Sequence, residues 1–151
     1  MDYTLTKLNK NDFTTLNCKQ LFGDNRTYRM FAKISKLNSC FKFAWQSDLI
    51  NPSVFEVNNV IYCIGIDLNF AIINFNSNTI LLNLQLDYFY YDVFIANNHI
   101  FVITELEVLK INVEKFKIID KFGLPEFYQS SKITDELIEI YCINGEIVKI
   151  K

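Results

Sequence analysis

The chain is poor in the residues that most enzyme sites require. It contains one histidine, His99, four glycines and one tryptophan among its 151 residues. One histidine without clustered cysteines does not supply zinc ligation or a nucleophile–histidine–acid triad, and no two glycines are close enough for a phosphate-binding loop. We therefore expect a protein that is not an enzyme, with no catalytic residues, no metal site and no cofactor.

Long apolar runs and a basic charge are also lacking. No window of eighteen residues is free of polar side chains, and residues 1–12 lack the basic and then apolar pattern of a signal peptide. The formal net charge is −2 and the isoelectric point is near 5.4, so no broad surface attracts phosphate backbones. These features predict a cytoplasmic protein that binds neither a membrane nor nucleic acid directly.

The four cysteines show neither CxxC spacing nor a neighbouring histidine; they are Cys18, Cys40, Cys63 and Cys142. In a reducing compartment, cysteines without such patterns are buried thiols. We expect all four to be free.

What the chain does contain is aromatic residues, twenty-two Phe and Tyr against four alanines. This composition favours strands over helices. A segment of eleven residues also occurs twice in similar form, as "VFEVNNVIYCI" at 54–64 and "VFIANNHIFVI" at 93–103. Each half alternates like a strand, and asparagine tolerates the positive φ of a two-residue type I′ turn, so the pairs at 58–59 and 97–98 predict tight hairpins.

The repeat continues beyond the hairpins. Third strands are predicted at 69–74, 107–112 and 146–151, and fourth strands at 79–84 and 117–122. Residues 31–43 align without a gap onto 70–82, which predicts an earlier unit whose first two strands fall within 14–23. The last unit lacks a fourth strand, and residues 3–9 alternate like a strand that could complete it.

Four antiparallel strands recurring with a period near thirty-nine resemble a small β-propeller. This resemblance implies one all-β domain over 1–151, with blades of four strands and an N-terminal strand that closes the last blade. The units are 14–45, 52–86, 91–122 and 128–151 plus 3–9. An irregular β-sandwich or barrel is the alternative.

Acidic and aromatic residues recur in equivalent loops of these units. Equivalent loops of a propeller gather on one face, which predicts an acidic face, and tyrosine is frequent among the anchors of protein interfaces. The acids are Asp67, Glu105, Glu107 and Glu146. The linkers between units add Tyr88, Tyr90 and Tyr91 before the third unit, and Glu126 and Tyr128 before the fourth.

A small, mildly acidic domain of this composition is similar to immunity proteins of contact-dependent growth inhibition and other polymorphic toxin systems. This resemblance implies a non-catalytic inhibitor that binds a cognate toxin, expected to be a basic nuclease, and blocks its active site. The inhibitor would be a monomer in a one-to-one complex, with acidic loops facing a cationic cleft. The alternatives are a carbohydrate-binding or glycoside-cleaving small propeller and a structural scaffold module.

Overall fold

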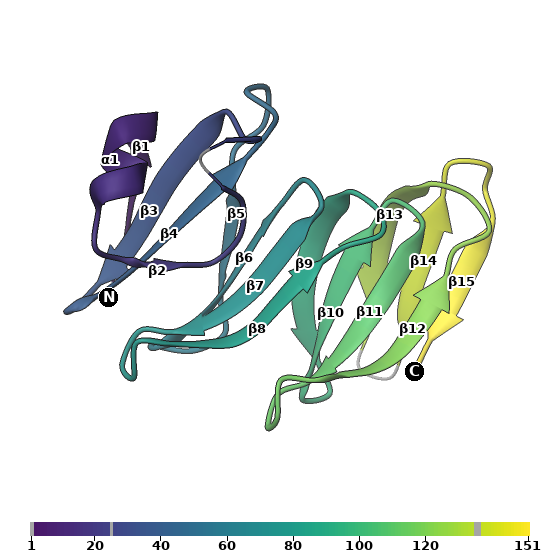
Figure 1. The fold of residues 1–151 in the computed structure, drawn as a ribbon. Coiled ribbons are helices and arrows are strands. Elements are labelled where there is room, and N and C mark those ends of the chain that lie inside the picture. Colours follow the sequence, from purple (N-terminus) through teal and green to yellow (C-terminus); the bar gives the residue numbers. More distant parts are fainter. Residues whose placement is uncertain (1, 25, 135–136) are drawn as a thin grey trace. The chain divides into compact units, whose positions relative to one another are not determined.

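The computed structural model describes residues 2–24, 26–134 and 137–151, and the chain divides into two compact units. The first unit ends at Leu86 and the second runs from Asp87 to Lys151. Each unit contains two small β-sheets (Figure 1). The expectation of one domain over residues 1–151 stays a prediction.

Two of the four sheets reproduce the predicted repeat closely. One is a meander in the first unit, formed by β5 (Ser53–Glu56), β6 (Ile61–Ile66), β7 (Asn69–Asn74) and β8 (Thr79–Gln85). The other is a meander in the second unit, formed by β9 (Tyr90–Ala96), β10 (His99–Thr104), β11 (Glu107–Asn112) and β12 (Ile118–Gly123). All neighbouring strands are antiparallel. The strands predicted within residues 52–86 and 91–122 therefore coincide with these two sheets.

The two asparagine pairs form different turns. Asn97 and Asn98 both have positive φ, 51° and 60°, as a type I′ hairpin requires. Asn58 and Asn59 are not in that conformation, so the prediction of a second type I′ turn is wrong. Instead the Asn58 side-chain oxygen accepts hydrogen bonds from the backbone N–H groups of Val60 and Ile61, a turn that asparagine forms readily.

The last sheet consists of β13 (Tyr128–Ile133), β14 (Ile138–Cys142) and β15 (Ile147–Ile150). The prediction that residues 3–9 complete it is wrong. Strand β1 (Thr4–Leu8) pairs antiparallel with β3 (Met30–Lys36) in the first sheet. Apolar contacts explain this choice, because Leu8 packs against a small cluster formed by Phe13, Phe31 and Ala44.

The first sheet is mixed, in the order β1-β3-β4-β2. Residues 14–23 were expected to hold two strands, but the chain forms helix α1 (Lys10–Thr15) and then the two-residue strand β2 (Lys19–Gln20). Strand β2 runs parallel to β4 (Ser39–Trp45). The helix begins at an N-cap, where the Asn9 side chain accepts a hydrogen bond of 2.7 Å from the Asp12 N–H.

Two of the cysteines are not the free thiols that the sequence predicted. Cys18 and Cys40 form a disulfide, which joins the segment after α1 to β4. The pair is brought together because β2 lies along β4, an arrangement that their separation of twenty-two residues does not reveal. Cys63 and Cys142 are free and buried, as predicted.

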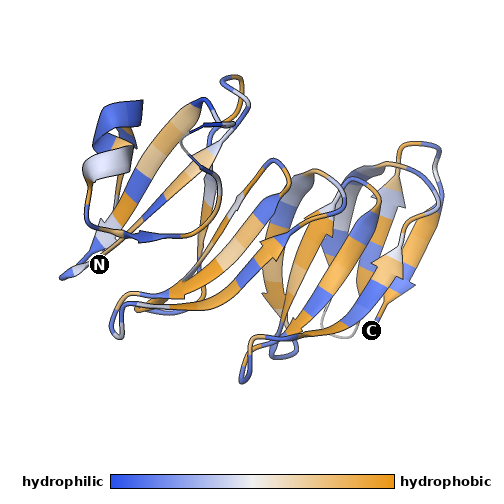
Figure 2. Ribbon diagram, in the orientation of Figure 1, coloured by the Kyte–Doolittle hydropathy of each residue, from blue (hydrophilic) through white to orange (hydrophobic). Residues whose placement is uncertain are grey.

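Each unit has its own apolar core. In the first, aromatic side chains of β4 such as Phe41, Phe43 and Trp45 pack with residues of β6 and β7. In the second, Phe101 and Ile103 of β10 pack with Ile140 of β14. Hydrophobic residues concentrate on the strands, whereas the turns and α1 are largely hydrophilic (Figure 2). The all-β composition predicted from aromatic richness is thus confirmed.

Candidate partner-binding surface

The turn between β10 and β11 organises one end of the second unit. Thr104, which is fully buried, donates a hydrogen bond of 2.8 Å from its hydroxyl to the Glu107 carbonyl. The same hydroxyl accepts a bond of 3.0 Å from the Glu107 N–H. A buried hydroxyl satisfied in both directions holds the turn, including Glu105, in one conformation. Thr104 was not among the residues predicted from the sequence.

Both linkers of the second unit are attached to this turn through backbone hydrogen bonds. The Glu105 N–H donates to the Phe89 carbonyl (2.9 Å), and the Glu105 carbonyl accepts from the Tyr128 N–H (2.8 Å). The Phe127 carbonyl accepts from the Ile143 N–H (2.9 Å), which joins the next turn to the same linker. The linkers before β9 and before β13 therefore lie at the same end of the unit.

Large aromatic side chains are exposed at this end. Phe89 is 49%, Tyr91 51% and Phe127 43% exposed. The Tyr91 and Tyr128 rings lie 5.7 Å apart between centroids, and these two residues line a shallow depression of about 280 Å³ together with Asp92 and Gln129. Exposed aromatic residues around a shallow depression suit contact with another macromolecule.

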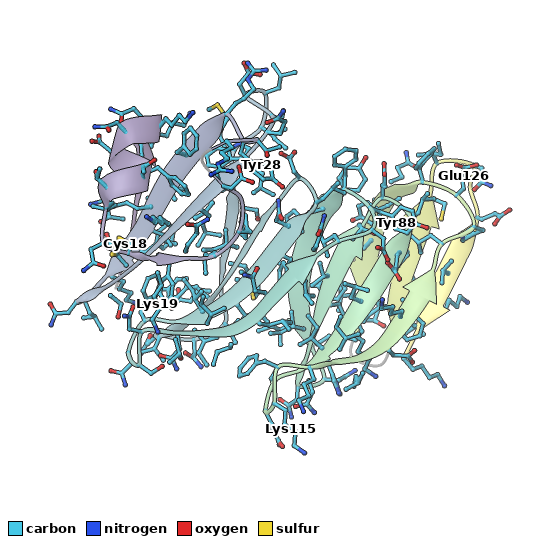
Figure 3. The ribbon with its side chains drawn as sticks, viewed as in Figure 1. Cys18, Lys19, Tyr28, Tyr88, Lys115 and Glu126 are labelled. Carbon is cyan, nitrogen blue, oxygen red and sulfur yellow. A yellow bond between two sulfur atoms is a disulfide. The ribbon has the colours of Figure 1, made fainter. Side chains whose placement is uncertain are left out.

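Carboxylates accompany the aromatic residues. Glu126 accepts a hydrogen bond from the Phe127 N–H, and Asp92 accepts one from the Val93 N–H, so each carboxylate is oriented by the backbone beside it. Figure 3 shows Tyr88 and Glu126 at the same end of the second unit, with Lys115 at the opposite end. We call this end the linker surface and define it by its exposed or half-buried residues, Tyr88, Phe89, Tyr91, Asp92, Glu105, Glu126, Phe127 and Tyr128.

Other predicted residues lie near the linker surface. Tyr90 is half-buried at the start of β9, opposite Thr104, and Glu107 is half-buried at the start of β11. Glu146 is exposed in the turn after β14, and its N–H donates to the Asn144 side chain. Ile143 lies in the same turn and is 58% exposed.

Asp67 belongs to the first unit, and it has a structural contact of its own. Its carboxylate accepts hydrogen bonds from the backbone N–H groups of Gln46 (3.1 Å) and Ser47 (3.2 Å). It therefore fixes the chain between β4 and β5 to the turn between β6 and β7. Because it already accepts two backbone hydrogen bonds, the Asp67 carboxylate is less available to pair with a lysine or arginine of a partner than a carboxylate without such bonds.

Phe89, Phe127 and Ile143 are part of this end but were not among the predicted binding residues. The repeat could have identified Phe89, because Phe89 and Phe127 occupy equivalent positions in the two linkers. The backbone carbonyl of each accepts a hydrogen bond from the N–H of a turn residue. Ile143 gave no such signal, since an isolated apolar residue in a turn does not reveal its exposure.

Two further features concern metal ligation and membrane spans within residues 2–24, 26–134 and 137–151. No group of three His, Cys, Asp or Glu side chains is arranged there to hold a metal ion. Within the same residues, no helix has the length and apolar character needed to cross a membrane.

Comparison with known proteins bears on the fold. No protein-family model and no curated protein matches the chain. Among solved structures, the computationally designed Ika4 protein superposes with a TM-score of 0.58 at 9% identity, over 87% of this chain and 89% of Ika4. The dihydro-heme d1 dehydrogenase NirN gives a TM-score of 0.52 at 9% identity, over 81% of this chain but only 32% of NirN.

These likenesses, at such low identity, show the fold alone. The chain is an all-β, propeller-like repeat of small sheets in which most neighbouring strands are antiparallel, as the sequence predicted.

Proposed function

We propose that the chain is a non-catalytic protein-binding inhibitor that docks on its partner through the linker surface. The observation that carries this proposal is the gathering of three exposed aromatic residues, Phe89, Tyr91 and Phe127, around one hydrogen-bonded turn. Rigid aromatic side chains supply large contact area at a small cost in conformational entropy. The backbone beside them is held by hydrogen bonds between Glu105 and both Phe89 and Tyr128, and between Ile143 and Phe127, so little ordering of the linkers remains when a partner binds.

The charge of the surface favours a basic partner. Its acids are Asp92, Glu105 and Glu126, and the defined surface contains no lysine or arginine. Acidic groups around an aromatic patch accelerate association with a cationic surface and disfavour nucleic acid. In its most specific form the proposal is an immunity protein that neutralises a bacterial toxin, a basic nuclease, by covering its active site in a one-to-one complex.

This proposal places the protein in the cytoplasm, where disulfides rarely persist. The Cys18–Cys40 disulfide would then be open in the cell and would close on oxidation. Rapid alkylation of intact cells, followed by mass spectrometry, would find Cys18 and Cys40 carrying the alkylating group. A cystine in cells lysed under the same conditions would instead place the protein in an oxidising compartment and contradict the immunity role.

The direct experiment measures binding to the polypeptide encoded beside this chain in its native genome. We expect a one-to-one complex by calorimetry and loss of the partner's nuclease activity in that complex. A double variant, Tyr91→Ser with Phe127→Ser, should weaken binding at least a hundredfold, because interface aromatic residues often contribute more than about 2 kcal/mol each.

Ile119→Ser supplies the matched control, since Ile119 is also 51% exposed but lies on β12, outside the linker surface. It should bind like the unmodified protein. Equal weakening by both changes, or none by the double variant, would remove the linker surface from the proposal.

A further inference from the structure

A second depression lies entirely within the first unit and has no part in the proposed inhibitor function. It has a volume of about 370 Å³ and is lined by residues 21–24 and Tyr28 on one side and by Asn69 and residues 83–85 on the other. Asn69 begins β7, and residues 83–85 end β8. The depression therefore lies between the chain after β2 and one end of the sheet that β7 and β8 share.

Three side-chain amides share one face of that sheet. Asn69 is the cross-strand partner of Gln85, and Ala71 is the partner of Asn83, so Asn69, Asn83 and Gln85 project from the same side. This side is turned toward the segment after β2, because Ala71 packs in the same core cluster as Leu21 and the Asn83 amide donates a hydrogen bond to the Leu21 carbonyl.

Asn69 is the informative member of the three. It is only 7% exposed, yet its side-chain amide makes no hydrogen bond with any described residue. In the described part of the chain the fully buried side-chain atom without a partner is Asn78 Oδ1, so the Asn69 amide still reaches solvent at the depression and is available for a hydrogen bond. At the wall of a depression, the missing partner can come from a bound polar molecule.

The opposite wall is built by a close backbone approach. Gly23 has a φ of +81°, and a Cβ atom there would overlap the Ala44 carbonyl oxygen. Only glycine lets this segment lie so close to β4, where the Ala44 N–H donates to the Phe22 carbonyl (2.9 Å). The wall that faces Asn69 is thus fixed in place.

The charges around the depression exclude anionic molecules. Among the described residues, its lining has no lysine or arginine, and Asp24 is the one charged side chain. The Asp24 carboxylate accepts hydrogen bonds from the backbone N–H groups of Thr27 (2.6 Å) and Arg26 (2.8 Å), and these bonds lower its pKa. A carboxylate already bound in this way repels phosphates and carboxylates and has reduced capacity for a cation.

We propose that this depression binds one neutral, polyhydroxylated ring of the size of a monosaccharide. Amide groups both donate and accept hydrogen bonds, as vicinal hydroxyls do, so Asn69, Gln85 and the oxygen of Asn83 match such a ring. The volume lies at the lower end of the range for small-molecule sites. The ring is either a free sugar or the terminal residue of a glycan, since both present the same hydroxyls.

The test is a titration of the intact, isotope-labelled protein with D-glucose, D-galactose, D-mannose and N-acetyl-D-glucosamine, followed by NMR. We expect at least one sugar to shift the backbone amide signals of residues 21–24, 69 and 83–85 in a saturable way. A parallel titration with an oligosaccharide that ends in the same sugar distinguishes the two sources, because tighter binding of the oligosaccharide identifies a glycan terminus.

Two variants locate the site. Gln85→Ala alters an exposed residue and should fold normally, and Asn69→Ala removes the unpaired amide; each should weaken binding at least tenfold. Asn76→Ala, another exposed amide in the turn after β7, is the control and should leave affinity unchanged. The absence of saturable shifts with every sugar, or unchanged affinity in both Gln85→Ala and Asn69→Ala, would overturn the proposal.

Discussion

The buried ammonium group of Lys36 donates a hydrogen bond of 2.8 Å to the Tyr62 hydroxyl, joining β3 to β6 inside the first unit. Lys36 is 5% exposed, and it also donates to the Asn59 carbonyl. Its charge lies 4.8 Å from the centre of the Tyr62 ring. A buried cation whose contacts in the described chain are a carbonyl, a hydroxyl and an aromatic face depends on those contacts for its stability.

Replacing Lys36 should therefore destabilise the protein. Lys36→Ala removes the donor of two buried or part-buried hydrogen bonds and leaves a cavity, so we expect a loss of about 2–4 kcal/mol in the free energy of unfolding. Urea unfolding followed by fluorescence measures it. Lys7→Ala, an exposed lysine on β1, should change stability by less than about 0.5 kcal/mol. A similar effect of both changes would show that the buried contacts of Lys36 contribute little.

Gly23 should tolerate no side chain. Because its φ is +81° and a Cβ atom would overlap the Ala44 carbonyl, Gly23→Ala should cost more than about 2 kcal/mol of stability. Gly123→Ala is the matched control, since its added Cβ meets no atom within 4 Å. Thermal melting of both variants tests the difference. Equal melting temperatures would mean that the segment after β2 moves away from β4 without cost.

Opening the disulfide should destabilise the first unit. The Cys18–Cys40 bond closes a loop with a sequence separation of twenty-two residues, and a loop of this length corresponds to about 3 kcal/mol in the chain-entropy model. The double variant Cys18→Ser, Cys40→Ser should lose this amount in denaturant unfolding. A reducing agent should have the same effect on the unmodified protein and none on the double variant. If the double variant loses more stability than the reduced unmodified protein, the additional loss does not come from the disulfide.

Alkaline pH should weaken the contribution of Cys63. Burial raises the pKa of this thiol to about 12, from a value of 9.0 without the protein environment. The folded state therefore favours the protonated thiol, and its contribution is fully present below about pH 9. It is lost as pH rises toward 12, because the unfolded chain ionises first.

The stability difference between the unmodified protein and Cys63→Ala should accordingly shrink as the pH of urea unfolding rises from 8 toward 11. Comparison of the two proteins at each pH cancels the titration of tyrosines and lysines. A difference that is constant with pH would contradict the burial of the thiol.

Much of the fold was predictable because its determinants are local. Strict alternation of apolar residues and a turn at Asn97–Asn98 identify strands and a hairpin within a few residues of chain. The predicted third strands at 69–74 and 107–112 coincide with β7 and β11. The repeat strengthened these predictions, because the same pattern of strands and turns occurs in two units of the sequence.

The N-terminal region was predicted poorly because contacts between distant residues decide its structure. Strand β1 could pair with any open sheet edge of suitable pattern, and Leu8, Phe13 and Phe31 select β3 by packing together. Helix α1 is short; Asn9 caps its start, and Lys42 supports its C-terminal end, where its ammonium group donates to the Phe13 and Leu16 carbonyls. Neither contact is visible in a local pattern.

The sequence by itself determined the all-β class, the repeated meanders and the presence of aromatic and acidic linkers, because strand alternation and turn chemistry depend on neighbouring residues. Only the tertiary structure decided which residues meet: Cys18 with Cys40, Phe89 and Tyr128 at Glu105, and Asn69 opposite the segment after β2. These contacts depend on packing and on backbone hydrogen bonds between segments far apart in the chain. The free energies of packing and hydrogen bonding together determine the structure of both candidate sites.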